Sequence, residues 1–213
     1  MEYRKVNDAD VDSWKEVILI YSSALKQIST KLEILNDEFQ HVHSYNPIEH
    51  IKSRIKTSES IVCKLKKNGY ESTIDNMIRH INDIAGIRVI CSFTTDIYRI
   101  AEMIENQSDI NVLSVKDYIK SPKSSGYKSY HMIVSIPIYL SDKTVDAKVE
   151  IQIRTVAMDF WASLEHKINY KFETNVPEHI KKELYDCAQM VSDLDAKMLS
   201  LNEEVQQISQ KNM

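Results

Sequence analysis

The sequence predicts an α/β (α+β) protein, with a small core of strands and helices and a long helix at each end of the chain. Residues Val145–Thr155 alternate apolar and polar side chains at every step, which is typical of a strand with one buried face. Residues 87–93 form a β-branched, apolar run that predicts a buried strand. Apolar residues recur at three- and four-residue steps over 10–40 and 177–207, which predicts two long amphipathic helices.

The composition of the 213 residues is that of a soluble globular protein, with 43% hydrophobic and 27% charged residues. The sequence has no run of 18 apolar residues and no signal-peptide core near Met1, so we expect no membrane segment. Its three cysteines are far apart and form no CxxC pair, which argues against disulfides and a cysteine zinc site. We therefore expect a cytoplasmic protein.

The distribution of charge and the low glycine content limit the kinds of ligand site that the protein could contain. The net charge is −4, but basic residues gather at 52–67 and 116–128 while acids gather at 173–204. Two local basic patches on an acidic body favour phosphate pockets over a continuous nucleic-acid track. Gly69, Gly86 and Gly126 are too widely spaced for a GxGxxG or Walker loop. Side chains must therefore hold any phosphates.

The first basic patch lies in a predicted helix that Pro47 opens and that runs to about Lys67. Four-residue spacing would align Lys56, Ser60 and Lys64 on one face, with Arg54 near the start of the helix. Two ammonium groups and a hydroxyl in a column could follow a triphosphate. A solvated lysine face fits the same spacing.

The next elements frame two unusual charges. A short helix over about 74–84 leads to Gly86, which we expect to end it, and then to the buried strand. Asp83 lies just before that strand, and Arg88 interrupts its apolar run. A charge in such a run must be paired or directed into a cleft.

The second half of the chain predicts a helix over 96–106, strands over 112–119 and 130–139, and a helix over 156–170 that packs Phe160, Trp161 and Leu164 inward. The serine-, proline- and glycine-containing segment 121–127 between the two strands is a flexible loop. The last helix runs from Pro177 to about Gln207. Long amphipathic helices at both ends also suggest an oligomer interface.

The alternating strand carries the strongest chemical signal. Glu150, Gln152 and Arg154 lie in a row on its polar face, where they could serve a metal, a ribose or base, and a phosphate. The solvated face of an antiparallel sheet would show the same alternation. Together with Asp83, Glu150 supplies two acids from separate elements, as a Mg²⁺ site needs when phosphates provide other ligands. Tyr127 in the flexible loop could stack on a base.

Four motifs in order resemble the alarmone synthetase domain of the RelA/SpoT family: DIAGIR (83–88), SGYKSYH (125–131), EIQIRT (150–155) and FWASLEH (160–166). Chain length resembles the small alarmone synthetases, the RelQ type above all. The resemblance implies a nucleotidyltransferase-like mixed sheet flanked by helices. It also implies transfer of pyrophosphate from ATP to the ribose 3′-OH of GDP, GTP or GMP, with Mg²⁺ as cofactor. The corresponding division is an N-terminal helix and connector (1–45), a catalytic domain (46–172) and an oligomerisation helix (173–213) of a homotetramer.

The resemblance also assigns roles to residues. Asp83 and Glu150 hold Mg²⁺, and Glu150 is the base toward the 3′-OH. Residues matching the ATP site include two arginines that sandwich adenine and a set of phosphate contacts: Arg54 and Arg88, then Lys56, Ser60, Lys64 and Lys116. Residues matching the guanosine-nucleotide site are Lys123, Tyr127 (stacking on guanine), Lys128, His131 and Gln152. The resemblance also implies residues that contact the substrate-binding side chains without touching substrate: Arg154, Glu165 and His166. Trp161 belongs to the core.

Some positions depart from the family pattern. The stretch that binds the product alarmone in RelQ-type tetramers reads Ser29, Glu33 and Asn36 here, with His50 in place of an aromatic residue. We hypothesise a tetramer with weak or no stimulation by pppGpp. Asp159 replaces a common asparagine, which leaves the acceptor preference open.

Three further expectations concern activity. The sequence contains no His-Asp dipeptide, so we expect synthesis without hydrolysis. A different nucleotidyltransferase is one alternative, although no Gly-Ser pair is present. A single-stranded RNA-binding regulator with weak or no catalysis is the other.

Overall fold

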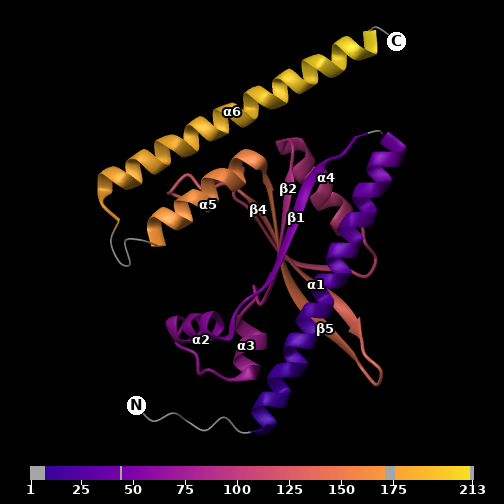
Figure 1. The fold of residues 1–213 in the computed structure, drawn as a ribbon, viewed down its shortest axis with the longest axis vertical. Helices are drawn as coiled ribbons and strands as arrows, with labels where there is room; N and C mark the ends of the chain where they lie inside the picture. The colour runs from indigo at the N-terminus through magenta and orange to yellow at the C-terminus, as the bar shows by residue number, and fades with distance from the viewer. Residues whose placement is uncertain (1–7, 44, 171–175, 212–213) are drawn as a thin grey trace.

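A computed structural model describes residues 8–43, 45–170 and 176–211, and Figure 1 shows its elements. The helices are α1 (Asp8–His43), α2 (Ser58–Lys67), α3 (Ile74–His80), α4 (Thr94–Glu105), α5 (Val156–Tyr170) and α6 (Glu178–Lys211). The strands are β1 (Ile48–Ile55), β2 (Ala85–Cys91), β3 (Asn111–Asp117), β4 (Tyr130–Tyr139) and β5 (Thr144–Thr155). None of the helices in these ranges is long and apolar enough to cross a membrane.

Within the described residues, the strands form a five-stranded sheet in the order β1-β2-β5-β4-β3. β2 and β5 run parallel, and the other neighbours pair antiparallel. The sheet is therefore mixed, and helices flank it, which confirms the expected fold class. β5, the strand with alternating polarity, is the central strand and is bonded along both edges.

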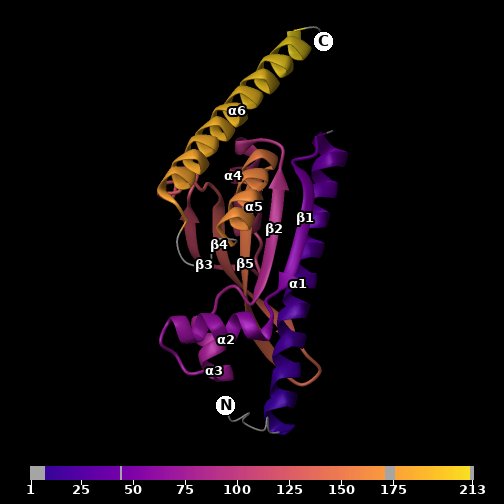
Figure 2. The same ribbon diagram turned by 60° about the vertical axis from the view of Figure 1, so that its left-hand side comes forward.

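Alternation along β5 separates a core face from a polar face. Ala147, Val149, Ile151 and Ile153 are buried, and their face packs into one hydrophobic core with the apolar stripe of α1. Helix α1 crosses β1, β2, β4 and β5. Because α1 covers this face, the side chains of Glu150 and Gln152 lie on the other face of the sheet. Figures 1 and 2 show α2 and α3 near one end of the sheet and α6 beyond the other.

The predicted helix from Pro47 to Lys67 is wrong in its first half. Residues Ile48–Ile55 form the edge strand β1, antiparallel to β2, with an irregularity between Ile48 and His50. The isoleucines at 48, 51 and 55 fit a helical period, but they are β-branched and β2 leaves an edge to be paired. Tertiary pairing decided the outcome, so α2 starts only at Ser58, where the Thr57 side chain caps the backbone N–H of Ser60 at 3.4 Å.

Smaller differences concern boundaries and facing. Helix α3 ends at His80, and Gly86 lies inside β2 rather than ending a helix. Phe160 and Leu164 were predicted to face inward, yet they are 63% and 41% exposed. Trp161 does pack inward, and its indole N–H donates to the Leu184 carbonyl of α6 at 2.9 Å. Helix α6 docks through this end and then runs clear of the other elements (Figures 1 and 2).

Candidate active site

The polar row on β5 forms a chain of hydrogen bonds. The Gln152 amide donates to Glu150 Oε2 at 2.9 Å, and Gln152 Oε1 accepts from Arg154 at 2.7 Å. Each contact joins residues two apart on one strand face, as the alternation predicted. The carboxylate, the amide and the guanidinium therefore hold one another in fixed orientations.

Asp83, in the turn before β2, carries two positive partners. Lys56 and Lys64 each place Nζ 2.8 Å from one of its carboxylate oxygens. Burial alone would raise the pKa of Asp83, but the two ammonium groups outweigh it and hold the pKa below its ordinary value. Asp83 is thus ionised at neutral pH. Lys56 precedes α2, so the two lysines meet at Asp83 and not in a helical column.

Glu150 faces the same region from β5. Its Oε1 lies 3.7 Å from His131 Nδ1 on the neighbouring strand β4. Burial would raise the pKa of Glu150, but His131 and the Gln152 amide outweigh it and lower the pKa. The negative charge of Asp83 acts on Glu150 in the opposite direction. The two carboxylates are therefore near enough to interact, and both are ionised at neutral pH.

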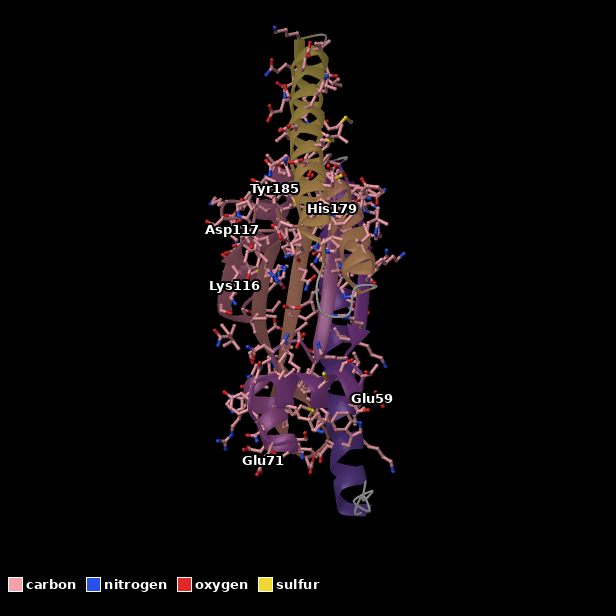
Figure 3. All side chains as sticks on the ribbon, turned by 90° about the vertical axis from the view of Figure 1, so that its left-hand side faces the viewer. Glu59, Glu71, Lys116, Asp117, His179 and Tyr185 are labelled. Carbon is pink, nitrogen blue, oxygen red and sulfur yellow. The ribbon has the colours of Figure 1, made fainter. Side chains whose placement is uncertain are left out.

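Two clefts meet at Glu150. One is lined by Lys52, Ser53, Arg54, Gly86, Ile87, Arg88, Glu150 and Gln152. The other is lined by Lys64, His80, Asn82, Asp83, Ser114, Lys116, Tyr118, Lys123, His131, Ile133 and Glu150. Figure 3 shows Lys116 on β3, between the α2–α3 end marked by Glu71 and the α6 end marked by Tyr185. A single carboxylate thus borders both clefts.

The first cleft, which we call the arginine cleft, lies over β1 and β2. Gly86 is in register with Arg54 on one side and Glu150 on the other. A Cβ added at Gly86 would lie 3.9 Å from Arg54 Cγ, so the Arg54 side chain reaches over the glycine. Arg88, two residues further along β2, is one third exposed and pairs with Asp159 at 3.0 Å. Two guanidinium groups therefore border one opening.

The second cleft, which we call the lysine cleft, has an aromatic rim: Tyr118 and His131 line the cleft, and Tyr127, which does not line it, contacts both rings. The Tyr127 hydroxyl lies 2.8 Å from His131 Nε2, and the Tyr118 ring meets both rings edge-on. Lys123 Nζ lies 4.9 Å from the ring centroids of Tyr118 and Tyr127. Arg154 also donates to the Tyr127 hydroxyl. The rim therefore combines aromatic rings, on which a base could stack, with cations that could bind phosphates.

Comparison with known proteins decides the family. Residues 53–175 match the family model described as "Region found in RelA / SpoT proteins". The GTP pyrophosphokinase YwaC of Bacillus subtilis is 47% identical over 195 residues, covering 92% of this chain and 93% of that protein. The chain belongs to the RelA/SpoT family. The resemblance drawn from the four motifs is confirmed at this level, while the RelQ subtype stays a prediction.

Solved structures of small alarmone synthetases share the fold of this RelA/SpoT-family chain. Small alarmone synthetase 2 of Bacillus subtilis matches with a TM-score of 0.82 at 46% identity, over 90% of this chain and 98% of that one. Small alarmone synthetase 1 of the same organism, bound to its product pppGpp, matches with a TM-score of 0.84 at 35% identity, over 91% and 98%. The similarity extends over almost the whole of each molecule.

Not every residue assigned by the family motifs lies at the clefts. Lys128 points to α6, where Nζ donates to the Ser192 hydroxyl. Ser60 Oγ accepts from the Thr57 hydroxyl at 3.0 Å in the first turn of α2 and lines neither cleft. On α5, Glu165 is half-buried and His166 is exposed. The other assigned residues line one of the clefts, except for three that each contact a lining residue: Lys56, Tyr127 and Arg154.

Three residues that sequence reasoning did not assign to the site belong to it. Tyr118 completes the aromatic rim, and its position beside the flexible loop was the available signal. His80 lines the lysine cleft and stacks on Tyr70 with ring centroids 3.8 Å apart. Asp159 contacts Arg88 and Arg154. No sequence pattern indicated the contacts of His80 and of Asp159, because those contacts depend on how α3 and α5 pack.

Proposed function

We propose that this chain is a GTP pyrophosphokinase that makes (p)ppGpp. It transfers the pyrophosphate of ATP to the ribose 3′-OH of a guanosine nucleotide. The names of YwaC and of its relative YjbM, a GTP pyrophosphokinase 35% identical to this chain, support this activity. The observation that carries the proposal is that Glu150 borders two clefts, one lined by two arginines and one with an aromatic, basic lining.

The donor nucleotide occupies the arginine cleft in this proposal. Planar guanidinium groups stack well on an adenine ring, and Arg54 and Arg88 border the same opening. The polyphosphate then extends toward Asp83, where Lys56 and Lys64 supply positive charge. Lys116, across the lysine cleft, adds a further cation.

The acceptor nucleotide occupies the lysine cleft. Tyr127 provides a ring for guanine, and Lys123 provides charge for the acceptor phosphates. His131 lies between the Tyr127 hydroxyl and Glu150, so it can orient both groups. In this arrangement the ribose lies next to Glu150, which the Gln152 amide holds at 2.9 Å.

The donor set fits Mg²⁺. Asp83 and Glu150 are ionised carboxylates that line the same cleft, and Mg²⁺ in nucleotide enzymes is held by one or two carboxylates plus phosphate oxygens. No cluster of three or more His, Cys, Asp or Glu suited to a metal occurs in residues 8–43, 45–170 and 176–211, so in this proposal the remaining ligands come from the substrates and water. When bound, Mg²⁺ supplies charge that neutralises the phosphate oxygens.

The chemistry needs little beyond positioning and charge. Glu150 takes the proton of the acceptor 3′-hydroxyl, whose oxygen bonds to the β-phosphorus of ATP. The bond from that phosphorus to the oxygen bridging to the α-phosphorus breaks, and AMP leaves with the electron pair. Transition states of this kind are stabilised mainly by alignment and by fixed positive charge. Lys56, Lys64 and Lys116 provide that charge.

The test is to incubate the protein with Mg²⁺, ATP and separately GMP, GDP or GTP, and to identify the products by mass. We expect AMP in step with a 3′-pyrophosphorylated guanosine nucleotide. AMP without that product would indicate ATP hydrolysis. No turnover with any acceptor would contradict the proposal and favour single-stranded RNA binding.

Glu150→Gln is the matched variant, because it removes the charge and keeps the size of the side chain. We expect at least a thousandfold loss of turnover, on the order of 4 kcal/mol of transition-state stabilisation, with an unchanged unfolding curve. Gln152 remains close enough to bond the amide. Turnover near that of the unmodified protein would refute the role of Glu150.

We also propose a homo-oligomer, a homotetramer by the family resemblance, with α6 in its interface. Apolar residues follow one another on α6 at alternating steps of four and three: Cys187, Val191, Leu194, Met198, Leu201, Val205 and Ile208. From Leu194 to Ile208 they are 46–60% exposed. This heptad pattern is that of a coiled-coil seam.

The mass in solution tests this interface. Leu201→Glu places a charge in the seam, and we expect light scattering to report a smaller assembly than for the unmodified protein. Glu203→Gln changes a charge on the same helix off the seam and serves as the control. A single-chain mass for the unmodified protein would refute the oligomer.

A further inference from the structure

Asp159 contacts two arginines that belong to different parts of the site. It lies in the first turn of α5, directly after β5. Its Oδ1 accepts from NH1 of Arg88 at 3.0 Å and from NH1 of Arg154 at 3.2 Å. Arg88 comes from β2 and Arg154 from β5, two neighbouring parallel strands. One carboxylate oxygen therefore joins two strands.

Both arginines depend on this carboxylate for charge balance. Arg154 is 4% exposed, and its other bonds go to neutral groups of Ser129, Tyr127 and Gln152. Arg88 has a buried Nε without a hydrogen-bond partner among the described residues. Buried like charges repel, and a buried guanidinium needs an acid beside it. Asp159 offsets that repulsion and holds one NH1 group of each arginine.

The two arginines reach opposite substrates. Arg88 borders the arginine cleft, which we assign to the donor. Arg154 places its guanidinium carbon 5.2 Å from the centroid of the Tyr127 ring and bonds the Tyr127 hydroxyl, on the acceptor side. It also bonds Gln152, which holds Glu150. The chain of contacts therefore runs from one cleft to the other through Asp159.

We propose that Asp159 is a positioning residue that couples the donor and acceptor subsites. It makes the affinity for each nucleotide depend on occupancy of the other. This inference rests on the proposed function, because it uses Arg88 as a donor contact and Tyr127 as an acceptor contact. The reciprocity is thermodynamic, so the coupling is measurable from either side.

The experiment is calorimetric titration of a guanosine nucleotide into the full-length protein, with and without a saturating non-hydrolysable ATP analogue, both with Mg²⁺. For the unmodified protein we expect the analogue to tighten guanosine-nucleotide binding, by about tenfold for a coupling of typical size. Asp159→Asn keeps a hydrogen-bond acceptor and removes the charge, and it should bring that ratio close to one. Asp159→Glu keeps the charge and should restore part of the coupling.

A control and a separate assay keep the outcomes distinct. Asp96→Asn removes another buried carboxylate, on α4, which packs on the core face of the sheet. It should leave the coupling ratio unchanged. An unmodified ratio of one, or a ratio that Asp159→Asn does not alter, overturns the inference. Absence of product from ATP and guanosine nucleotide overturns the proposed function, and that is measured separately by mass.

Discussion

Substitution of Gly126 tests whether α6 supports the loop that carries Tyr127. Gly126 adopts φ of +85°, and a Cβ built on it would lie 2.6 Å from the Ala188 Cβ of α6 and 3.4 Å from Tyr185 Cδ2. Carbon atoms in contact lie about 3.5–4.0 Å apart. A methyl group at this position therefore requires either the loop or α6 to move.

The cost can be divided into two parts. An L-residue in the left-handed region costs roughly 1–2 kcal/mol. Forcing an extra methyl group into a packed contact costs roughly 1–3 kcal/mol more. Gly69 provides the matched control, because it has φ of +79° and open space within 4 Å of its added Cβ. Gly69→Ala should show only the first part, and Gly126→Ala both, about 2–5 kcal/mol in total.

The assay is urea unfolding of the two variants and of the unmodified protein, with KM for the acceptor nucleotide measured alongside. We expect Gly126→Ala to lose more unfolding free energy than Gly69→Ala and to raise KM for the acceptor, because Tyr127 follows directly. Adding Ala188→Gly should relieve the contact in Gly126→Ala. Equal losses for the two single variants would refute the packing of α6 on this loop.

Three further outcomes are expected. Gly86→Val should raise KM for ATP at unchanged stability, because the larger side chain fills the arginine cleft beside Arg54. Gly86→Ala adds only an ordinary van der Waals contact and should leave KM for ATP unchanged. Equal KM values for the two variants would contradict this. Asp83 has a folded-state pKa below that of an unperturbed aspartate, so its stabilising contribution is present above about pH 4 and is lost as pH falls through the folded pKa. The unfolding free-energy gap between the unmodified protein and Asp83→Asn should therefore shrink below pH 4 in denaturant titrations, and a widening gap would contradict this. Adding pppGpp should stimulate the initial rate weakly or not at all, because Ser29 and Glu33 of α1, at positions that the family resemblance links to the product alarmone, carry no positive charge; a several-fold increase would refute the hypothesis.

The parts of the site that the sequence predicted depend on local geometry. The period of two along β5 placed Glu150, Gln152 and Arg154 on one face, and the structure joins them by hydrogen bonds. Asp83 precedes a buried strand in the sequence, and in the structure it lies just before the start of β2 and lines the same cleft as Glu150. Such patterns persist because a strand alternates its side chains whatever surrounds it.

The parts that the sequence did not predict depend on contacts between distant segments. The spacing of the isoleucines in β1 also fits a helix. These residues form a strand because they pair with the edge of β2. Lys128 belongs to a basic patch in the sequence, but α6 packs so close that the Lys128 ammonium group donates a hydrogen bond to a side chain of that helix. Asp159 meets Arg88 because α5 starts beside β2, which no spacing in the sequence reveals.

The position of β5 at the centre of the sheet has a consequence for the order in which parts of the site unfold on heating. Glu150 lies on a strand bonded along both edges, whereas Arg54 is on an edge strand and Tyr127 is in a loop. Edges and loops open locally at lower free energy than central strands, and amide hydrogen exchange should follow that gradient. On mild heating the protein should therefore lose affinity for both nucleotides while Glu150, the proposed base, is still in place. KM should rise first, and kcat should fall only near global unfolding.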